Sequence, residues 1–306
     1  MTQFFKLVKR NVKLFFKDKG LFFTSLITPL ILLVLYGTFL GNIFKDSYVQ
    51  SVPEDVNIPA RIIAGLVSGQ LFASILAVSC VTVAFCSNML MVQDKITGVR
   101  KDLLISPLNK HTLALSYFAA TFITTLTVCF FACAICFVYT AVVGWYFSAA
   151  DVLLILVDVV VLTLFGTLLS SIVNGFLETQ GQLSAVGTIV SSVYGFISGA
   201  YMPVATFGKG LQYVLTFLPS TYGTSLIKNH TMRGALSALA DAGMPTEAVS
   251  DIKKFNDLNL SFFGNDVSVL AMFGILLGTV ILLLGIYVLI NLPRNKKPKS
   301  DNNKNI

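Results

Sequence analysis

The chain has 306 residues, of which 55% are hydrophobic and only 12% charged, and its formal net charge is +7. Soluble domains carry about 25% charged residues, whereas the mean hydropathy here is +0.78, so the composition excludes an ordinary water-soluble domain. A helix needs about 20 apolar residues to cross a bilayer. The sequence therefore predicts an all-α integral membrane protein with one transmembrane domain over residues 1–306. Its six expected spans are 21–43, 62–92, 112–143, 152–173, 183–203 and 267–290.

Residues 1–20 precede the first span and predict an amphipathic surface helix. Apolar side chains repeat at Phe4, Val8, Val12 and Phe15, and a second set of basic side chains repeats almost identically at Lys6, Arg10, Lys13 and Lys17. At about 100° per residue the two sets lie on opposite sides of a helix. Such a helix lies in the headgroup plane with its basic side toward anionic lipid.

The distribution of Lys and Arg predicts how the chain is oriented in the membrane. The segments 1–20, 93–111, 174–182 and 291–306 together hold fifteen of the 22 basic residues. Since basic residues favour the cytoplasmic side, we expect a multi-pass protein of a plasma (cytoplasmic) membrane, bacterial in origin, with both termini in the cytosol. Anionic lipid of the inner leaflet accounts for the positive charge, so no nucleic-acid partner is expected.

Two of the spans carry small residues at every fourth position. In span two these are Gly65 and Gly69, continued by two alanines, and in span five they are Gly187, Ser191, Gly195 and Gly199. Such rows let helix backbones approach closely in lipid. They are compatible with a subunit interface, with a helix–helix contact that moves beside a transport pathway, or with a static contact inside the chain.

The outer segment 204–266 has two predicted parts. A short helical stripe over 207–223, bracketed by Pro203 and Pro219, is too short to cross the bilayer and predicts a re-entrant turn. Residues 231–262 predict two small polar helices that form a cap.

The residues needed for independent chemistry are missing from the sequence. It contains no GxxxxGK[ST], HExxH or GxSxG pattern, and its five cysteines, including Cys133 and Cys136 at CxxC spacing, all fall in expected spans without a nearby His or carboxylate. We therefore expect neither an enzyme nor a metal site. A secondary transporter or channel is the alternative, and it would depend on Asp158, the isolated acid of span four. A lipid-modifying membrane enzyme would need a catalytic cluster that the sequence lacks.

The most distinctive polar stretch is QDKITGVRKDLLISPLNK, residues 93–110, between spans two and three. Its charged residues include Asp94, Arg100 and Lys101, and its apolar residues include Leu103 and Leu104. Ser106-Pro107 ends the element, because proline disfavours helix at the residue before it. The apolar residues either pack against the protein's own helix ends or enter a cleft on a cytosolic partner.

This stretch resembles the membrane permease subunits of type-2 ABC exporters. Asp94, Gly98, Leu103-Leu104 and Ser106-Pro107 occupy the matching places of that family's motif, and SGAYMPV at 198–204 and LPSTYGTSLIK at 218–228 resemble its hallmark around the outer turn. Val99 and Arg100 stand where the family usually has Thr and Leu.

The resemblance implies a function and partners. The chain would be a permease that pairs with a second copy or a related permease, and each would bind a separate ABC ATPase that holds ATP and Mg. The 93–110 element would be the coupling helix, spans one, two and five would line the pathway, and the turn between Pro203 and Pro219 would gate its outer exit. The exported substrate would be amphipathic, lipidic, an antibiotic or a glycan.

Overall fold

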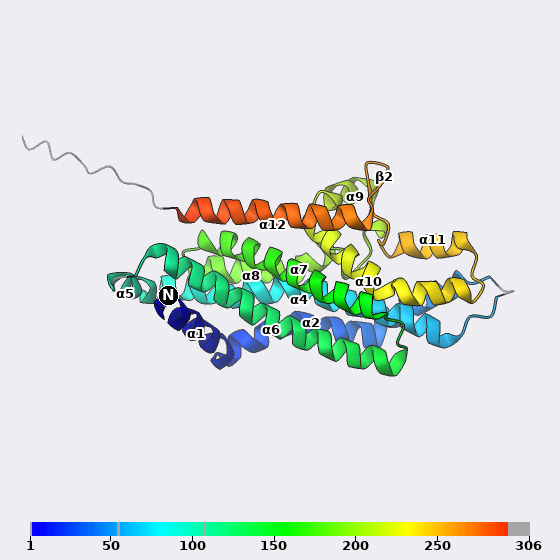
Figure 1. Cartoon of the computed structure of the whole chain (residues 1–306), viewed down its shortest axis with the longest axis horizontal. Coiled ribbons are helices and arrows are strands. Elements are labelled where there is room, and N and C mark those ends of the chain that lie inside the picture. Colours follow the sequence, from blue (N-terminus) through cyan, green and yellow to red (C-terminus); the bar gives the residue numbers. More distant parts are fainter. Residues whose placement is uncertain (1, 54–55, 107, 293–306) are drawn as a thin grey trace, which may run out of the picture.

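The computed structural model describes residues 2–53, 56–106 and 108–292. It is an all-α bundle whose long helices run along one axis, with α5 and the N-terminus at one end and α11 near the other (Figure 1). A two-stranded hairpin, β1 (Ser261–Phe262) and β2 (Asn265–Asp266), is a minor addition.

The expected N-terminal amphipathic helix is present as α1 (Thr2–Lys17), and its position at the membrane surface stays a prediction. Asp18 separates it from the next helix and caps that helix by accepting a hydrogen bond from Leu21 N at 3.1 Å. The first span is longer than the expected 21–43. α2 (Lys19–Leu35), the π-helical turn η1 (Tyr36–Leu40) and α3 (Gly41–Gln50) form one continuous helix of 32 residues.

Five helices in the described part of the chain are long and apolar enough to cross a membrane. They are the α2–α3 helix, α4 (Ala60–Ile96), α6 (Lys110–Val143), α7 (Ala149–Gly175) and α12 (Val269–Asn291). The short α5 (Val99–Ile105) connects α4 to α6. A capping box between Ser148 and Asp151 starts α7, because it satisfies backbone groups that the first turn leaves free.

The expected fifth span corresponds to α8 (Gln180–Ile197), which is not among those five helices. Its 18 residues would extend about 27 Å at 1.5 Å per residue, but hydroxyl, amide and glycine residues dilute its apolar character. The helix ends before residue 203 because Gly199 adopts a left-handed φ of +73°, a conformation typical of helix ends. A sixth crossing remains a prediction.

The outer segment differs from the expected arrangement in one respect. The 3₁₀ turn η2 (Val204–Thr206) and the short α9 (Lys209–Thr216) come first, but α10 (Pro219–Asp241) is a single 23-residue helix that packs against α4, α7 and α12. The first of the two expected polar helices is therefore the end of a long bundle helix, and only α11 (Thr246–Phe255) is separate. No proline follows Pro219 within this helix, and its two glycines do not interrupt it. Its mixed polarity is the reason that the sequence did not predict one continuous helix.

The centre of the bundle is α4. In its most apolar stretch 94% of the residues are buried, compared with 28% for α6 and 17% for α12. α2, α6, α7, α8 and α10 all pack against it. The outward faces of α6 and α12 are apolar, which fits contact with lipid.

Candidate functional site

The short helix α5 projects from one end of the bundle, between α4 and α6. Gly98 precedes it with a φ of +87°, which permits the sharp turn out of α4. At its other end the Ser106 hydroxyl donates to the Leu103 carbonyl at 2.6 Å. Pro107, the last expected residue of the motif, lies outside the described residues.

The apolar residues of α5 face two ways. Leu103 and Leu104 are half-buried against a cluster of the chain's own residues, formed by Leu7, Met91, Leu113 and Tyr117. Ile105 is 84% exposed. The two leucines therefore pack against the protein's own helix ends, whereas Ile105 presents an apolar side chain outward beside exposed Lys101 and Asp102, and its entry into a partner's cleft stays a prediction.

Asp94, near the end of α4, joins three helices. Its buried carboxylate accepts two hydrogen bonds from the Arg10 guanidinium of α1, at 2.7 and 3.2 Å, and one from the Tyr117 hydroxyl of α6, at 2.6 Å. The hydrogen bond with Asp94 raises the pKa of Arg10 above its ordinary value. A bidentate pair of this kind fixes orientation as well as distance.

This contact corrects the expectation for Arg10. It does not share the exposed side of α1 with Lys6, Lys13 and Lys17 but turns inward to Asp94. The helical period places Arg10 in the basic set, and only the position of α4 decides that it faces the bundle.

The neighbouring Lys95 reaches the opposite side of α4. Its ammonium donates to the carbonyl of Leu177 at 2.8 Å and lies 3.6 Å from the exposed carboxylate of Glu178. Asp94 and Lys95 thus tie the base of α5 to α1, to α6 and to the loop between α7 and α8.

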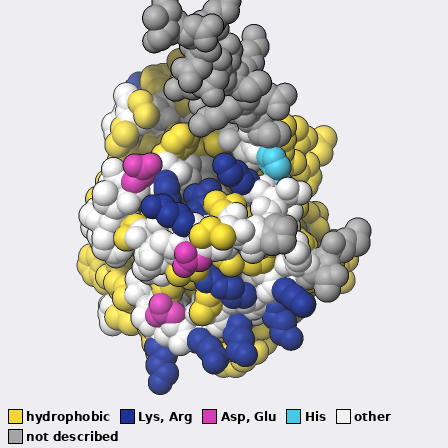
Figure 2. Space-filling model, turned by 90° about the vertical axis from the view of Figure 1, so that its left-hand side faces the viewer, with side chains coloured by type: hydrophobic (Ala, Val, Ile, Leu, Met, Phe, Trp, Pro, Cys, Tyr) yellow, Lys and Arg dark blue, Asp and Glu magenta, His cyan; other side chains and the backbone are white. Residues whose placement is uncertain are grey.

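This end of the molecule is strongly basic. Figure 2 shows Lys and Arg side chains gathered over it, with a few acidic groups and an apolar patch between them. Arg100 is half-buried and lines a cavity of about 170 Å³, to which Tyr117, Tyr287 and Asn291 contribute further polar groups. Anionic lipid headgroups or an acidic protein surface complement such a face.

A larger cleft of about 600 Å³ lies between α2 and α8. Hydroxyl and amide side chains line much of it, including Thr24, Gln93 and Ser191, and Gly187 is also part of its wall. α8 also contributes exposed Ser184, Thr188 and Ser192 to this wall, spaced four residues apart on one helix face. A continuous row of hydroxyl groups is poorly matched to lipid.

The small residues of span two make close contacts within the chain. A Cβ at Gly65 would lie 2.6 Å from the Tyr146 ring, and one at Gly69 would lie 2.6 Å from the Thr231 carbonyl of α10. On α8, a Cβ at Gly187 would meet Met89 of α4 at 2.6 Å, and one at Gly195 would collide with the Tyr201 ring. These glycines therefore serve intramolecular packing, with Gly187 and Ser191 also at the cleft.

The turn after α8 is held by a buried ion pair that sequence reasoning missed. Lys228 of α10 is fully buried, donates to the Gly199 carbonyl at 2.9 Å and lies 3.5 Å from Asp257. Asp257 also accepts from the backbone N–H groups of Val204 and Ala205, at 2.6 and 3.0 Å. Pro203 immediately precedes η2 and Pro219 starts α10, so both flank this locked turn.

Asp158 has a partner that was not expected. Its carboxylate and His230 Nδ1 of α10 are 2.5 Å apart, and one helix turn further Arg233 pairs with Asp151 at 2.6 Å. The only sequence signal was the presence of Lys228, His230 and Arg233 in one otherwise uncharged helical stretch. The described residues contain no group of three or more His, Cys, Asp or Glu able to hold a metal ion.

Comparison with known proteins gives one result. The family described as ABC-2 type transporter matches residues 2–229 of the chain. This range includes α1, the α4–α5–α6 unit, the α2–α8 cleft and the first part of α10. No curated protein and no solved structure matches.

Proposed function

Because the chain belongs to the ABC-2 type transporter family, and so is a multi-pass membrane permease of ABC transporters, we propose that it is the permease subunit of an ATP-driven exporter. It works with a separate ABC ATPase that binds ATP and Mg. It lies in a bacterial plasma membrane with both termini, and therefore α5, in the cytosol. Its substrate is amphipathic, lipidic, an antibiotic or a glycan.

The anchored but exposed α5 is the observation that carries this proposal. A coupling element needs an outward surface for the ATPase and a firm attachment to the spans. Ile105 supplies the surface, and the Leu103–Leu104 contacts together with Asp94 supply the attachment. Motion imposed on α5 would reach α1, α4 and α6 with little loss, because packed elements transmit displacement rather than absorb it.

The hydroxyl row of α8 supports a second permease copy. Ser184, Thr188 and Ser192 are exposed in this single chain, at the edge of the α2–α8 cleft. Two copies placed with these faces opposed would enclose a polar pathway between α2, α4 and α8. This agrees with the roles that the family resemblance implies for spans one, two and five.

The test uses the chain co-expressed with an ABC ATPase subunit that copurifies with it from its native membrane. Ile105→Asp is expected to weaken ATPase binding by at least about tenfold, as loss of an interface hot spot does, and to abolish permease-stimulated ATP hydrolysis. Ile105→Leu is the matched control and should retain both. Leu104→Asp is less decisive, because it also disturbs the chain's own cluster.

Two outcomes would reject the proposal. Full ATPase binding and stimulation by Ile105→Asp would remove the coupling role of α5. Normal transport by vesicles that contain this chain without any ATPase or nucleotide would instead favour the secondary transporter or channel.

A further inference from the structure

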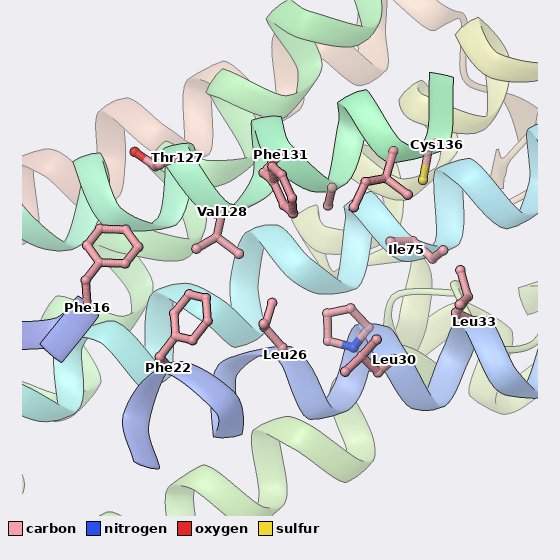
Figure 3. Close-up of a pocket in the computed structure, with 13 residues that line it drawn as sticks. Phe16, Phe22, Leu26, Leu30, Leu33, Ile75, Thr127, Val128, Phe131 and Cys136 are labelled. Carbon is pink, nitrogen blue, oxygen red and sulfur yellow. The ribbon is translucent and has the colours of Figure 1, made fainter. Parts of the chain in front are cut away.

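An apolar groove runs between α2 and α6 on the side of α2 that faces away from the α2–α8 cleft. It has a volume of about 490 Å³, within the range of about 300–1,000 Å³ typical of small-molecule sites. Figure 3 shows Phe22, Leu26 and Leu30 of α2 opposite Val128 and Phe131 of α6, with Ile75 of α4 behind them. Thr127 contributes the one hydroxyl group among the lining side chains.

The groove is as long as one leaflet is deep. On α2 the lining residues extend from Phe22 to Leu33, which corresponds to about 16 Å at 1.5 Å per residue. Half of a hydrocarbon core is about 15 Å thick. Because both walls belong to membrane-spanning helices, the groove lies in hydrocarbon, and a lipid chain parallel to the helices matches its shape and chemistry.

The end of the groove at α1 carries positive charge. Phe16 closes this end, and it is flanked by the exposed Lys17 and, one turn earlier, the exposed Lys13. The nearest acid in sequence, Asp18, lines the α2–α8 cleft and caps Leu21. A headgroup above the groove would therefore meet two cations from α1.

We propose that this groove is a specific site for one anionic phospholipid. One acyl chain lies between α2 and α6, and the headgroup phosphate lies at Lys13 and Lys17. The lipid joins α1 and α2 to α6 and takes no part in the transport pathway, since the cleft is lined by other residues of α2, including Leu21, Thr24 and Thr28. The proposal does not depend on the substrate or on the ATPase.

The headgroup contact is tested by native mass spectrometry of the purified chain with added phosphatidylglycerol or phosphatidylcholine of identical acyl chains. Phosphatidylglycerol should be retained preferentially. Lys13→Gln/Lys17→Gln should weaken its retention by about 25-fold, since each basic residue near an anionic membrane surface contributes about fivefold. Lys6→Gln/Lys9→Gln removes the same charge two turns away and should change retention by less than about twofold.

The acyl contact is tested by filling the groove. Ala132 lines it and Ala134 is exposed on α6 outside it. Ala132→Leu should reduce retention of both lipids, whereas Ala134→Leu should not. Equal retention of the two headgroups, equal effects of the two lysine pairs, or full retention by a folded Ala132→Leu variant would overturn the proposal. If the Ala132→Leu variant fails to fold, the comparison of the Lys13/Lys17 variant with the Lys6/Lys9 variant still tests the lipid site.

Discussion

Arg10 and Asp94 are 84 residues apart in sequence and form a bidentate ion pair at the base of α5. This pair fastens the surface helix α1 to the end of α4, and Tyr117 adds α6 to the same junction. α1 is therefore a structural part of the candidate coupling site.

Loss of the Arg10 side-chain charge should loosen this junction. Arg10→Met leaves the buried Asp94 carboxylate with Tyr117 alone, and hydrogen bonds to charged groups contribute about 1.5–3 kcal/mol. We expect a lower thermal unfolding temperature in detergent and faster proteolysis of α1. Lys9→Met is the control, because Lys9 is exposed on the same helix. Identical unfolding temperatures for the two variants would contradict the anchoring role.

A side chain at Gly98 should strain the turn into α5. Nothing lies within 4 Å of a Cβ built at this position, so the effect of Gly98→Ala comes from the φ of +87° alone, at about 1–2 kcal/mol. ATPase stimulation should fall while the spans stay folded. Gly98→Asn should be milder, because Asn tolerates the left-handed region. An Asn variant as impaired as the Ala variant would argue against backbone strain.

Breaking the buried pair of Lys228 and Asp257 should be severe. Lys228→Met leaves Asp257 buried without its cation, which typically costs about 3–5 kcal/mol. Lys228→Met/Asp257→Asn removes both charges and should recover part of the lost stability, since the amide oxygen introduced at position 257 can still accept from the backbone of η2. Thermal unfolding of the single and double variants checks this. A double variant no more stable than Lys228→Met would show that the charges are not coupled.

A substitution in the Asp158–His230 pair can distinguish an ATP-driven permease from a secondary transporter or channel. If this pair is structural, Asp158→Asn should lower thermal stability, while transport per folded molecule stays within about twofold of the wild type and independent of ion gradients. A secondary transporter would instead lose ion-driven transport in this variant. Reconstituted vesicles with and without an imposed proton gradient provide the measurement.

Parts of this architecture could be predicted from the sequence because single segments encode them. Length and hydropathy identify the long transmembrane candidates, and the double period of residues 4–17 identifies an amphipathic helix. The partners of α10 could not be predicted, since the pairs Lys228–Asp257 and His230–Asp158 join segments distant in sequence. Nor could the seven residues of α5 show that Leu104 packs inward while Ile105 is exposed, because so short a helix has no measurable period.

The central position of α4 has a consequence for how the protein is made. α4 enters the membrane early in synthesis, yet α10, which covers Gly69 and its neighbours, follows more than a hundred residues later. Until then, lipid must shield a helix whose small-residue face ends up entirely within protein. A chain truncated before Asp241 would leave that face of α4 uncovered, and we expect the membrane quality-control machinery to degrade it.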